Sequence, residues 1–181
     1  MNRYDTEKTY RQISMDDYLE KYVNVGEFLE YCKQCPNYGK IWSCPPYDFD
    51  PEDVWRGFSS IYIAARKITF PKGQSPAGRE ELAKILSEVK DDMSRELFEL
   101  EKEFPGSVSL SAGSCGMCRG GGCTRPEGEP CRFPEKMRFS IESLGGNVGL
   151  TVSRLMGIEL EWMEEGKMPS YFVLVGGLMK K

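Results

Sequence analysis

The sequence predicts an α/β fold, with a small mixed sheet, a long amphipathic helix on one face and two cysteine-rich metal-binding loops. Three observations predict it. Segments rich in β-branched and aromatic residues occur at 60–70, 107–113 and 171–178. A long stretch between the first two repeats apolar residues every three or four positions. The segments at about 32–50 and 113–134, which hold all the cysteines, are rich in Pro and Gly and are expected to be irregular.

The N-terminal elements are predicted from local signals. Residues 6–13 have the composition of a short edge strand. Ser14, with Asp17 three residues later, is typical of a helix N-cap, and predicts a helix through about Tyr22. A second helical stretch at about 25–31 leads to the first cysteines.

The strand at 60–70 precedes the clearest helix, at about 76–104. One stripe of apolar residues runs along this helix, at Leu82, Leu86, Val89, Met93, Leu97, Leu100 and Phe104. Pro105-Gly106 ends the helix, and residues 108–112 form the next predicted strand. A strand–helix–strand order predicts a right-handed crossover and a parallel pair.

The C-terminal part contains a helical pattern at 135–144, a segment at 148–156 that fits a helix or a strand, and a final strand at 171–178. The turn residues Gly145-Gly146 separate the first two segments. The length of 181 residues predicts a single metal-binding domain over 1–181.

Composition excludes several classes of function. The net charge of −4 argues against nucleic-acid binding, which usually needs a basic surface. No apolar run approaches the roughly 20 residues that cross a bilayer. The polar start, residues 1–11, lacks the apolar stretch of a secretory signal, so we expect a cytoplasmic protein.

The chain has seven cysteines and no histidine. In a reducing compartment thiols stay reduced, and an odd number spoils a fully paired disulfide framework. The absence of histidine excludes mixed Cys/His zinc sites and Ser-His-Asp catalysis. The chemistry therefore depends on thiolates, carboxylates, Lys, Arg, Tyr or a cofactor.

The second cysteine group has the spacing C-x2-C-x4-C-x7-C, at Cys115, Cys118, Cys123 and Cys131. Four thiolates in one loop can close around a tetrahedral metal or a [4Fe-4S] cluster. The spacing lacks the second short pair of a zinc knuckle, so a cluster is favoured over zinc. The glycines Gly113, Gly116, Gly120, Gly121 and Gly122 can turn backbone N–H groups toward sulfur, and positive charge is supplied by Arg119, Arg125 and Arg132.

The first group, Cys32, Cys35 and Cys44, has the spacing C-x2-C-x8-C and is one thiolate short of a closed site. Three interpretations remain open: a cluster with one iron not bound by cysteine, a cluster completed by a cysteine of the other loop, and one zinc site that combines Cys32/Cys35 with Cys115/Cys118. In the first case water, an exogenous ligand, or a carboxylate such as Asp48 or Asp50 would hold the fourth iron.

Two sequence signatures resemble a known family. The first runs from Cys32-x2-Cys35-Pro36 to Trp42-Ser43-Cys44-Pro45-Pro46-Tyr47; the second runs from Cys115-Gly116-x-Cys118 through Pro130-Cys131-Arg132 to Ser140-Ile141-Glu142-Ser143-Leu144-Gly145. Together they resemble a family of predicted metal-binding proteins, mostly from anaerobic bacteria and methanogens. The resemblance implies that these seven cysteines bind metal as [4Fe-4S] clusters, and it implies no settled activity.

The function expected from the sequence is electron transfer or a redox reaction, as a component of an iron–sulfur oxidoreductase. The four-cysteine cluster would relay electrons, and the three-cysteine cluster would bind a substrate or accept an electron. Two alternatives are a zinc-stabilised binding module and a carrier of metalloclusters. The expected partner is a redox protein or a small-molecule substrate, and homo-oligomerisation is left open.

Overall fold

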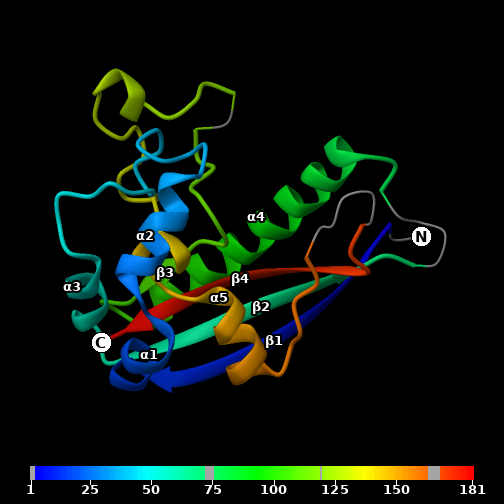
Figure 1. Cartoon of the computed structure of the whole chain (residues 1–181), viewed down its shortest axis with the longest axis horizontal. Coiled ribbons are helices and arrows are strands. Elements are labelled where there is room, and N and C mark those ends of the chain that lie inside the picture. Colours follow the sequence, from blue (N-terminus) through cyan, green and yellow to red (C-terminus); the bar gives the residue numbers. More distant parts are fainter. Residues whose placement is uncertain (1–2, 72–75, 119, 163–167) are drawn as a thin grey trace.

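The computed structural model describes residues 3–71, 76–118, 120–162 and 168–181, and a four-stranded sheet forms its centre. The strands are β1 (Asp5–Ser14), β2 (Ser60–Thr69), β3 (Val108–Leu110) and β4 (Tyr171–Lys180). They lie in the order β1-β2-β4-β3, and every neighbouring pair is antiparallel (Figure 1). The α/β fold class is confirmed, and so is the N-terminal edge strand, which is ten residues long.

The predicted parallel pair is wrong. β2 and β3 run in the same direction, since both are antiparallel to β4, but β4 lies between them. Buried residues on both faces suit β4 to this central place. A Cβ at its Gly176 would lie 2.6 Å from the carbonyl oxygen of Leu110, so glycine permits the close approach of β3. The sheet is antiparallel rather than mixed.

One face of the sheet is covered by α4 (Arg79–Glu103), which confirms the long amphipathic helix. Its buried residues are Leu82, Ile85, Val89, Met93 and Leu97. Four of them pack against buried side chains of the sheet: Met93 and Leu97 against Ala64 and Leu178, and Ile85 and Val89 against Ile68. Each large side chain buried in this way contributes about 1.5–3 kcal/mol. None of the helices in the described ranges is long and apolar enough to cross a membrane.

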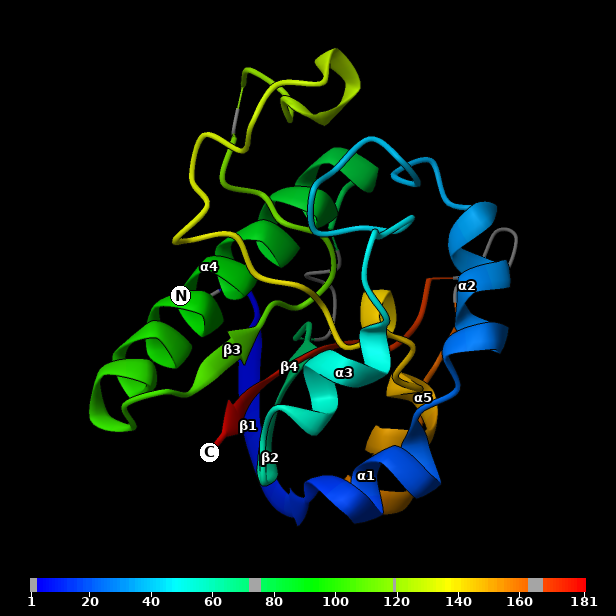
Figure 2. The same cartoon turned by 90° about the vertical axis from the view of Figure 1, so that its left-hand side faces the viewer.

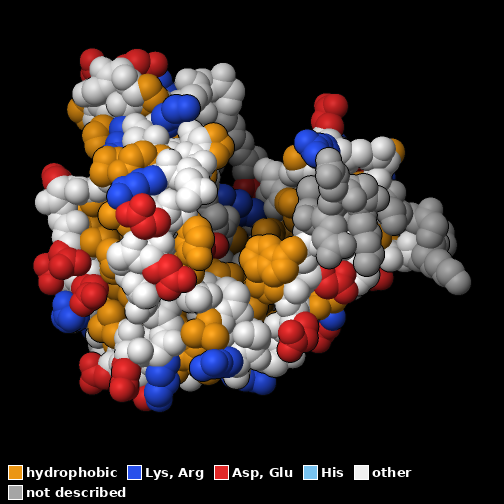
Figure 3. Space-filling view, viewed as in Figure 1, with side chains coloured by type: hydrophobic (Ala, Val, Ile, Leu, Met, Phe, Trp, Pro, Cys, Tyr) orange, Lys and Arg blue, Asp and Glu red, His pale blue; other side chains and the backbone are white. Residues whose placement is uncertain are grey.

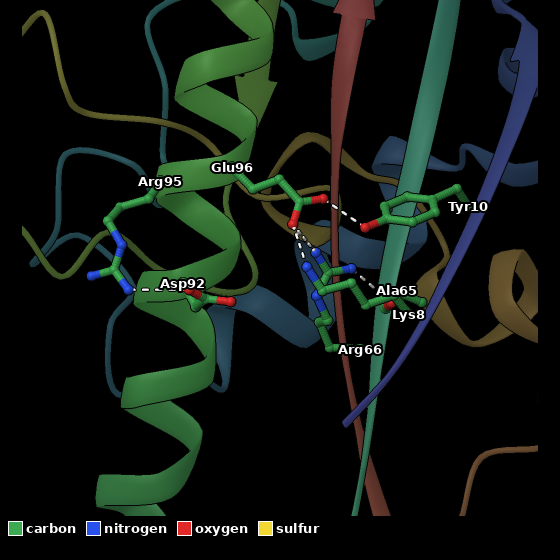
Figure 4. Close-up of polar contacts among 7 residues, drawn as sticks. All are labelled: Lys8, Tyr10, Ala65, Arg66, Asp92, Arg95 and Glu96. Carbon is green, nitrogen blue, oxygen red and sulfur yellow. Dashed lines mark hydrogen bonds and ion pairs between the residues drawn. The ribbon is translucent and has the colours of Figure 1, made fainter. Parts of the chain in front are cut away.

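A charged cluster joins α4 to the sheet (Figure 4). Glu96 accepts hydrogen bonds from Lys8 (2.8 Å), Tyr10 (2.6 Å) and Arg66 (2.6 Å). Arg66 is only 2% exposed and lies over the Tyr10 ring, with its guanidinium carbon 5.2 Å from the ring centroid. Burial alone would raise the pKa of Glu96, but these three donors outweigh it and lower that pKa to about 2.

The opposite face is covered by α1 (Met15–Tyr22), α3 (Pro51–Arg56) and the segment 141–156, so helices flank the sheet on both sides (Figure 2). Ser14 caps α1 as predicted, since its hydroxyl accepts the N–H of Asp17. The helix α3 was not predicted. It brings the buried Trp55 into this core, where the indole N–H donates to the carbonyl of Leu144 at 2.9 Å.

The predicted helix at 135–144 is wrong, because only Glu142–Leu144 forms a single 3₁₀ turn. Ser111 and Ser140 form a parallel bridge, and side chain–backbone hydrogen bonds between Ser140 and Ser143 replace helical ones. The undecided segment is helical, with α5 (Val148–Leu150) followed by a π-helical turn (Thr151–Leu155).

Candidate metal centre

The two cysteine loops, residues 34–50 and 113–134, lie side by side in both views and form what we name the loop lobe (Figures 1 and 2). Direct hydrogen bonds join them. The indole N–H of Trp42 donates to the hydroxyl of Thr124 at 3.2 Å, and Asn37 donates to Ser114 at 3.3 Å. Cysteines far apart in the sequence are therefore close in space.

Arg125 fastens the first loop to the second. Its guanidinium donates to the carbonyls of Ile41 (2.9 Å), Cys44 and Pro46, and lies 5.3 Å from the centroid of the Trp42 ring. Arg132 likewise donates to the carbonyl of Gly122 at 2.7 Å. These two arginines, expected to supply charge, are thus engaged in holding backbone in place. The third, Arg119, lies outside the described residues.

The second cysteine group surrounds one hollow of about 590 Å³. All four of its cysteines line the hollow, and Trp42 from the first loop borders it. Gly120 and Gly122 adopt the left-handed conformation, with φ of 77° and 70°, which lets the loop turn around this space. Burial raises the pKa of Cys115, whereas hydrogen bonds from the backbone of Met117 and Arg138 act to lower it.

The first group gathers at the C-terminal end of α2 (Val25–Lys33). Cys32 lies in the last turn, and the N–H of Cys35 donates to its carbonyl at 3.0 Å. Burial raises the pKa of Cys44, and the charges of Cys35 and Cys32 raise it further. Cys32 and Cys35 are thus joined through the backbone at the end of this helix, and Cys44 lies in the loop that follows.

The two groups are adjacent. The hydroxyl of Ser43, which precedes Cys44, accepts the N–H of Cys115 at 2.9 Å. Lys90 of α4 donates to the carbonyl of Ser114, directly before Cys115. Burial lowers the pKa of Lys90, and the charges of Cys115, Glu142 and Cys44 are among those that oppose this shift.

Glu142 is the functional candidate that sequence reasoning missed. Its Oε2 is buried and has no hydrogen-bond partner among the described residues. It lines a cavity of about 160 Å³ together with Cys32. Burial raises the pKa of Glu142, opposed by hydrogen bonds from its own backbone and Ser140 and by the charge of Lys90. No local pattern identifies it, because the cavity forms only in the folded chain.

The cysteines are available as metal ligands. Each of the seven cysteines, all of them described, is a free thiol. No three His, Cys, Asp or Glu side chains of the described ranges converge where they could hold a single metal ion. The four cysteines of the second group line one hollow, and thiolates are ligands of zinc and of iron–sulfur clusters alike.

One of three comparisons with known proteins found a match, and it supports metal binding. The family model described as "Predicted metal-binding protein (DUF2284)" matches residues 19–178. Neither the curated proteins nor the solved structures include a match to the chain. The match spans both cysteine groups and all but the first strand of the sheet. The chain therefore belongs to this family of predicted metal-binding proteins.

Proposed function

We propose that the protein is an iron–sulfur electron carrier or redox component. In this proposal Cys115, Cys118, Cys123 and Cys131 hold one [4Fe-4S] cluster, and Cys32, Cys35 and Cys44 hold a second. The proposal depends on one observation. The two cysteine groups, whose thiols are all free, are joined by the hydrogen bond from the Cys115 N–H to the Ser43 hydroxyl. Two redox groups held this close can exchange electrons, whereas a structural metal needs no neighbour.

Several side chains have roles that suit such clusters. Backbone N–H groups of Met117 and Arg138 donate toward the Cys115 sulfur, a contact that tunes cluster potential. Trp42 borders the four-cysteine hollow and restricts the access of water. Lys90 supplies positive charge beside ligands that carry negative charge when they bind metal.

A hollow beside Cys115 offers a place for a redox partner or an anionic substrate. It has a volume of about 750 Å³ between α4 and the segment Cys115–Met117, and Lys90, Lys136 and Arg138 line it. Figure 3 shows the surface hollowed between the loop lobe and α4, with basic side chains inside. The lining also includes Arg95 and Asp91. Arg138 is paired with Glu101 at 2.7 Å and Arg95 with Asp92 at 3.1 Å, so Lys90 and Lys136 are the groups proposed to attract an acidic partner.

The test is anaerobic purification followed by iron, acid-labile sulfide and zinc analysis, with EPR of the reduced protein. We expect about eight iron and eight sulfide per chain for two [4Fe-4S] clusters, and a brown colour with broad visible absorption. Stoichiometric zinc without sulfide would refute the proposal and favour a zinc-stabilised binding module. Clusters that pass rapidly to an apo-ferredoxin would instead favour a cluster carrier.

A further inference from the structure

We propose that the hollow of about 750 Å³ beside Cys115, here called the basic hollow, binds a small organic anion with an apolar body. This inference names the ligand class of the redox component proposed above, and it rests on that function. It places the ligand next to the four-cysteine group, whereas the sequence suggested the three-cysteine group as the place for a substrate.

The basic hollow exists because the sheet is incomplete at one edge. β4 is ten residues long, but β3 pairs with only its residues 177–179. After Leu110 the chain leaves the sheet, and the N–H of Ser111 donates to the carbonyl of Phe139 at 2.8 Å. Residues 171–176 of β4 thus have no strand on this side in the described part of the chain, and α4 lines the space that remains.

One part of the lining is apolar and suits the body of an organic ligand. It is formed by Leu110 and Leu174 of the sheet and by Leu86 and Phe98 of α4. Three of these side chains, Leu86, Phe98 and Leu174, are only partly buried, and a ligand that covers them removes apolar surface from water. The volume lies within the range of about 300–1,000 Å³ that is usual for small-molecule sites.

The charges of the lining favour an anion. Lys136 is exposed and forms no ion pair within the described ranges. Lys90 donates to the carbonyl of Ser114, which is a neutral acceptor. Asp91 also lines the hollow, but the cations of the lining outnumber it. A concave surface with an excess of positive charge attracts anions.

The position of the basic hollow connects it to the candidate metal centre. Cys115, Gly116 and Met117 line it, and the same three residues line the four-cysteine hollow. A wall of three residues thus separates the two spaces. A ligand in the basic hollow would lie beside the proposed four-cysteine cluster and would need no bond to iron.

The test uses two probes that separate the anionic group from the apolar body. 8-Anilinonaphthalene-1-sulfonate carries a sulfonate on an aromatic body, and N-phenyl-1-naphthylamine is the same molecule without the sulfonate. In anaerobic equilibrium dialysis we expect about one sulfonate probe to bind per chain. The amine should bind about tenfold more weakly, because it lacks the charge-assisted contacts. Equal affinities of the two probes would overturn the proposal.

Variants at exposed positions locate the bound probe. Lys136→Gln should weaken binding of the sulfonate about threefold and leave the amine unaffected. Ser87→Glu puts a carboxylate one turn from Lys90 in the lining and should weaken the sulfonate about tenfold, whereas the size-matched Ser87→Gln should weaken it less. Lys84→Gln, at an exposed lysine of α4 outside the lining, is the control for Lys136→Gln. Equal affinities of these two lysine variants would overturn the assignment.

A further measurement separates this inference from the iron–sulfur function. Reduced, paramagnetic clusters should broaden the NMR signals of the bound sulfonate, because the two hollows share one wall. Protein without iron and sulfide would overturn the function, and dialysis would still test the basic hollow. Absence of binding, or binding without broadening, in protein that contains both clusters would overturn only the proposed ligand site.

Discussion

The loop lobe and the part of the molecule formed by β1–β4, α1, α3 and α4, here called the sheet body, are held together by different forces. The sheet body has large apolar cores on both faces of the sheet, and its central carboxylate, Glu96, has three donors. The loop lobe has no regular helix or strand in its described residues beyond one 3₁₀ turn (Arg125–Glu127), and its contacts are mostly single hydrogen bonds to backbone carbonyls. The sheet body is thus held mainly by buried apolar side chains, whereas the loop lobe is held mainly by hydrogen bonds, which suits our proposal that bound metal completes it.

Among the variants that test this difference, Cys118→Ser is expected to have the largest effect. Ligands to a structural metal contribute folding free energy, so the loop lobe should lose more than about 3 kcal/mol of local stability. Hydrogen exchange of metal-loaded protein should accelerate at 113–134 and leave β2 and β4 protected. Met117→Leu, at an exposed position of the same loop, is the control. Unchanged protection of the loop in Cys118→Ser would show that metal does not organise it.

The next largest effect is expected at Gly145, in the turn that packs against α2. Gly145→Ala forces a side chain into positive φ and against Val25, at a cost of about 3 kcal/mol. Since this turn packs against α2, which carries Cys32, the first cluster should be lost while the second remains, as counted by iron analysis and EPR. Gly157→Ala is the control that distinguishes backbone strain from the steric clash with Val25. Gly157 also has positive φ (+69°), but a Cβ there would meet no atom within 4 Å. Equal effects of the two variants would contradict the steric role of Gly145.

Within the sheet body, Glu96→Gln should lower the free energy of unfolding by about 2 kcal/mol at neutral pH. The substitution leaves the buried Arg66 without its charged partner, and the value allows for solvent screening at Glu96, which is 30% exposed. The pKa of Glu96 is about 2, below its ordinary value of 4.5. Its contribution is therefore full above pH 4.5 and is lost as pH falls toward 2.

Urea unfolding of wild type and Glu96→Gln across that range should show the difference in unfolding free energy shrinking as pH falls. Cluster content, compared at neutral pH, should be the same in both proteins. Glu99→Gln, on an exposed turn of the same helix, should have little effect. A difference that stays constant down to pH 2 would contradict the lowered pKa.

The smallest effect is expected for Ser43→Ala, which removes the acceptor of the Cys115 N–H and should cost about 1 kcal/mol. Both clusters should still load, but hydrogen exchange at Cys115 should accelerate. Ser114→Ala, which removes the weaker acceptor of Asn37 at 3.3 Å, should change less. An equal or larger effect of Ser114→Ala would argue against the Ser43 contact as the main link between the groups.

The sheet body was largely predictable because its signals are local. The stripe on α4, the β-branched run of β2 and the Ser14 cap each involve neighbouring residues. The signal for α3 was also present, in Asp50 as N-cap before Pro51 and Glu52. The position of β4 was not predictable from its order in the chain, since it inserts between two strands that precede it.

The sequence identified the cysteines of the candidate site, but it did not identify Glu142 beside them. Cysteine spacing predicts two groups of ligands, and the four cysteines of the second group do line one hollow. Glu142 lines a cavity with Cys32 because the turn at Gly145 packs against α2, more than a hundred residues earlier in the chain. The helical pattern at 135–144 misled for the same reason, since the bridge of Ser140 to Ser111 outweighs local preference.

The central position of β4 affects the order of events during synthesis. Cys131, the last thiol, is made before any residue of β4, and at about 5–20 residues per second the ribosome needs several seconds to reach Lys180. During that interval β2 has no partner on one side, and β3 has none at all among the named strands. All seven thiols are thus present on the nascent chain before the sheet can close, and the cell must protect or load them in that window.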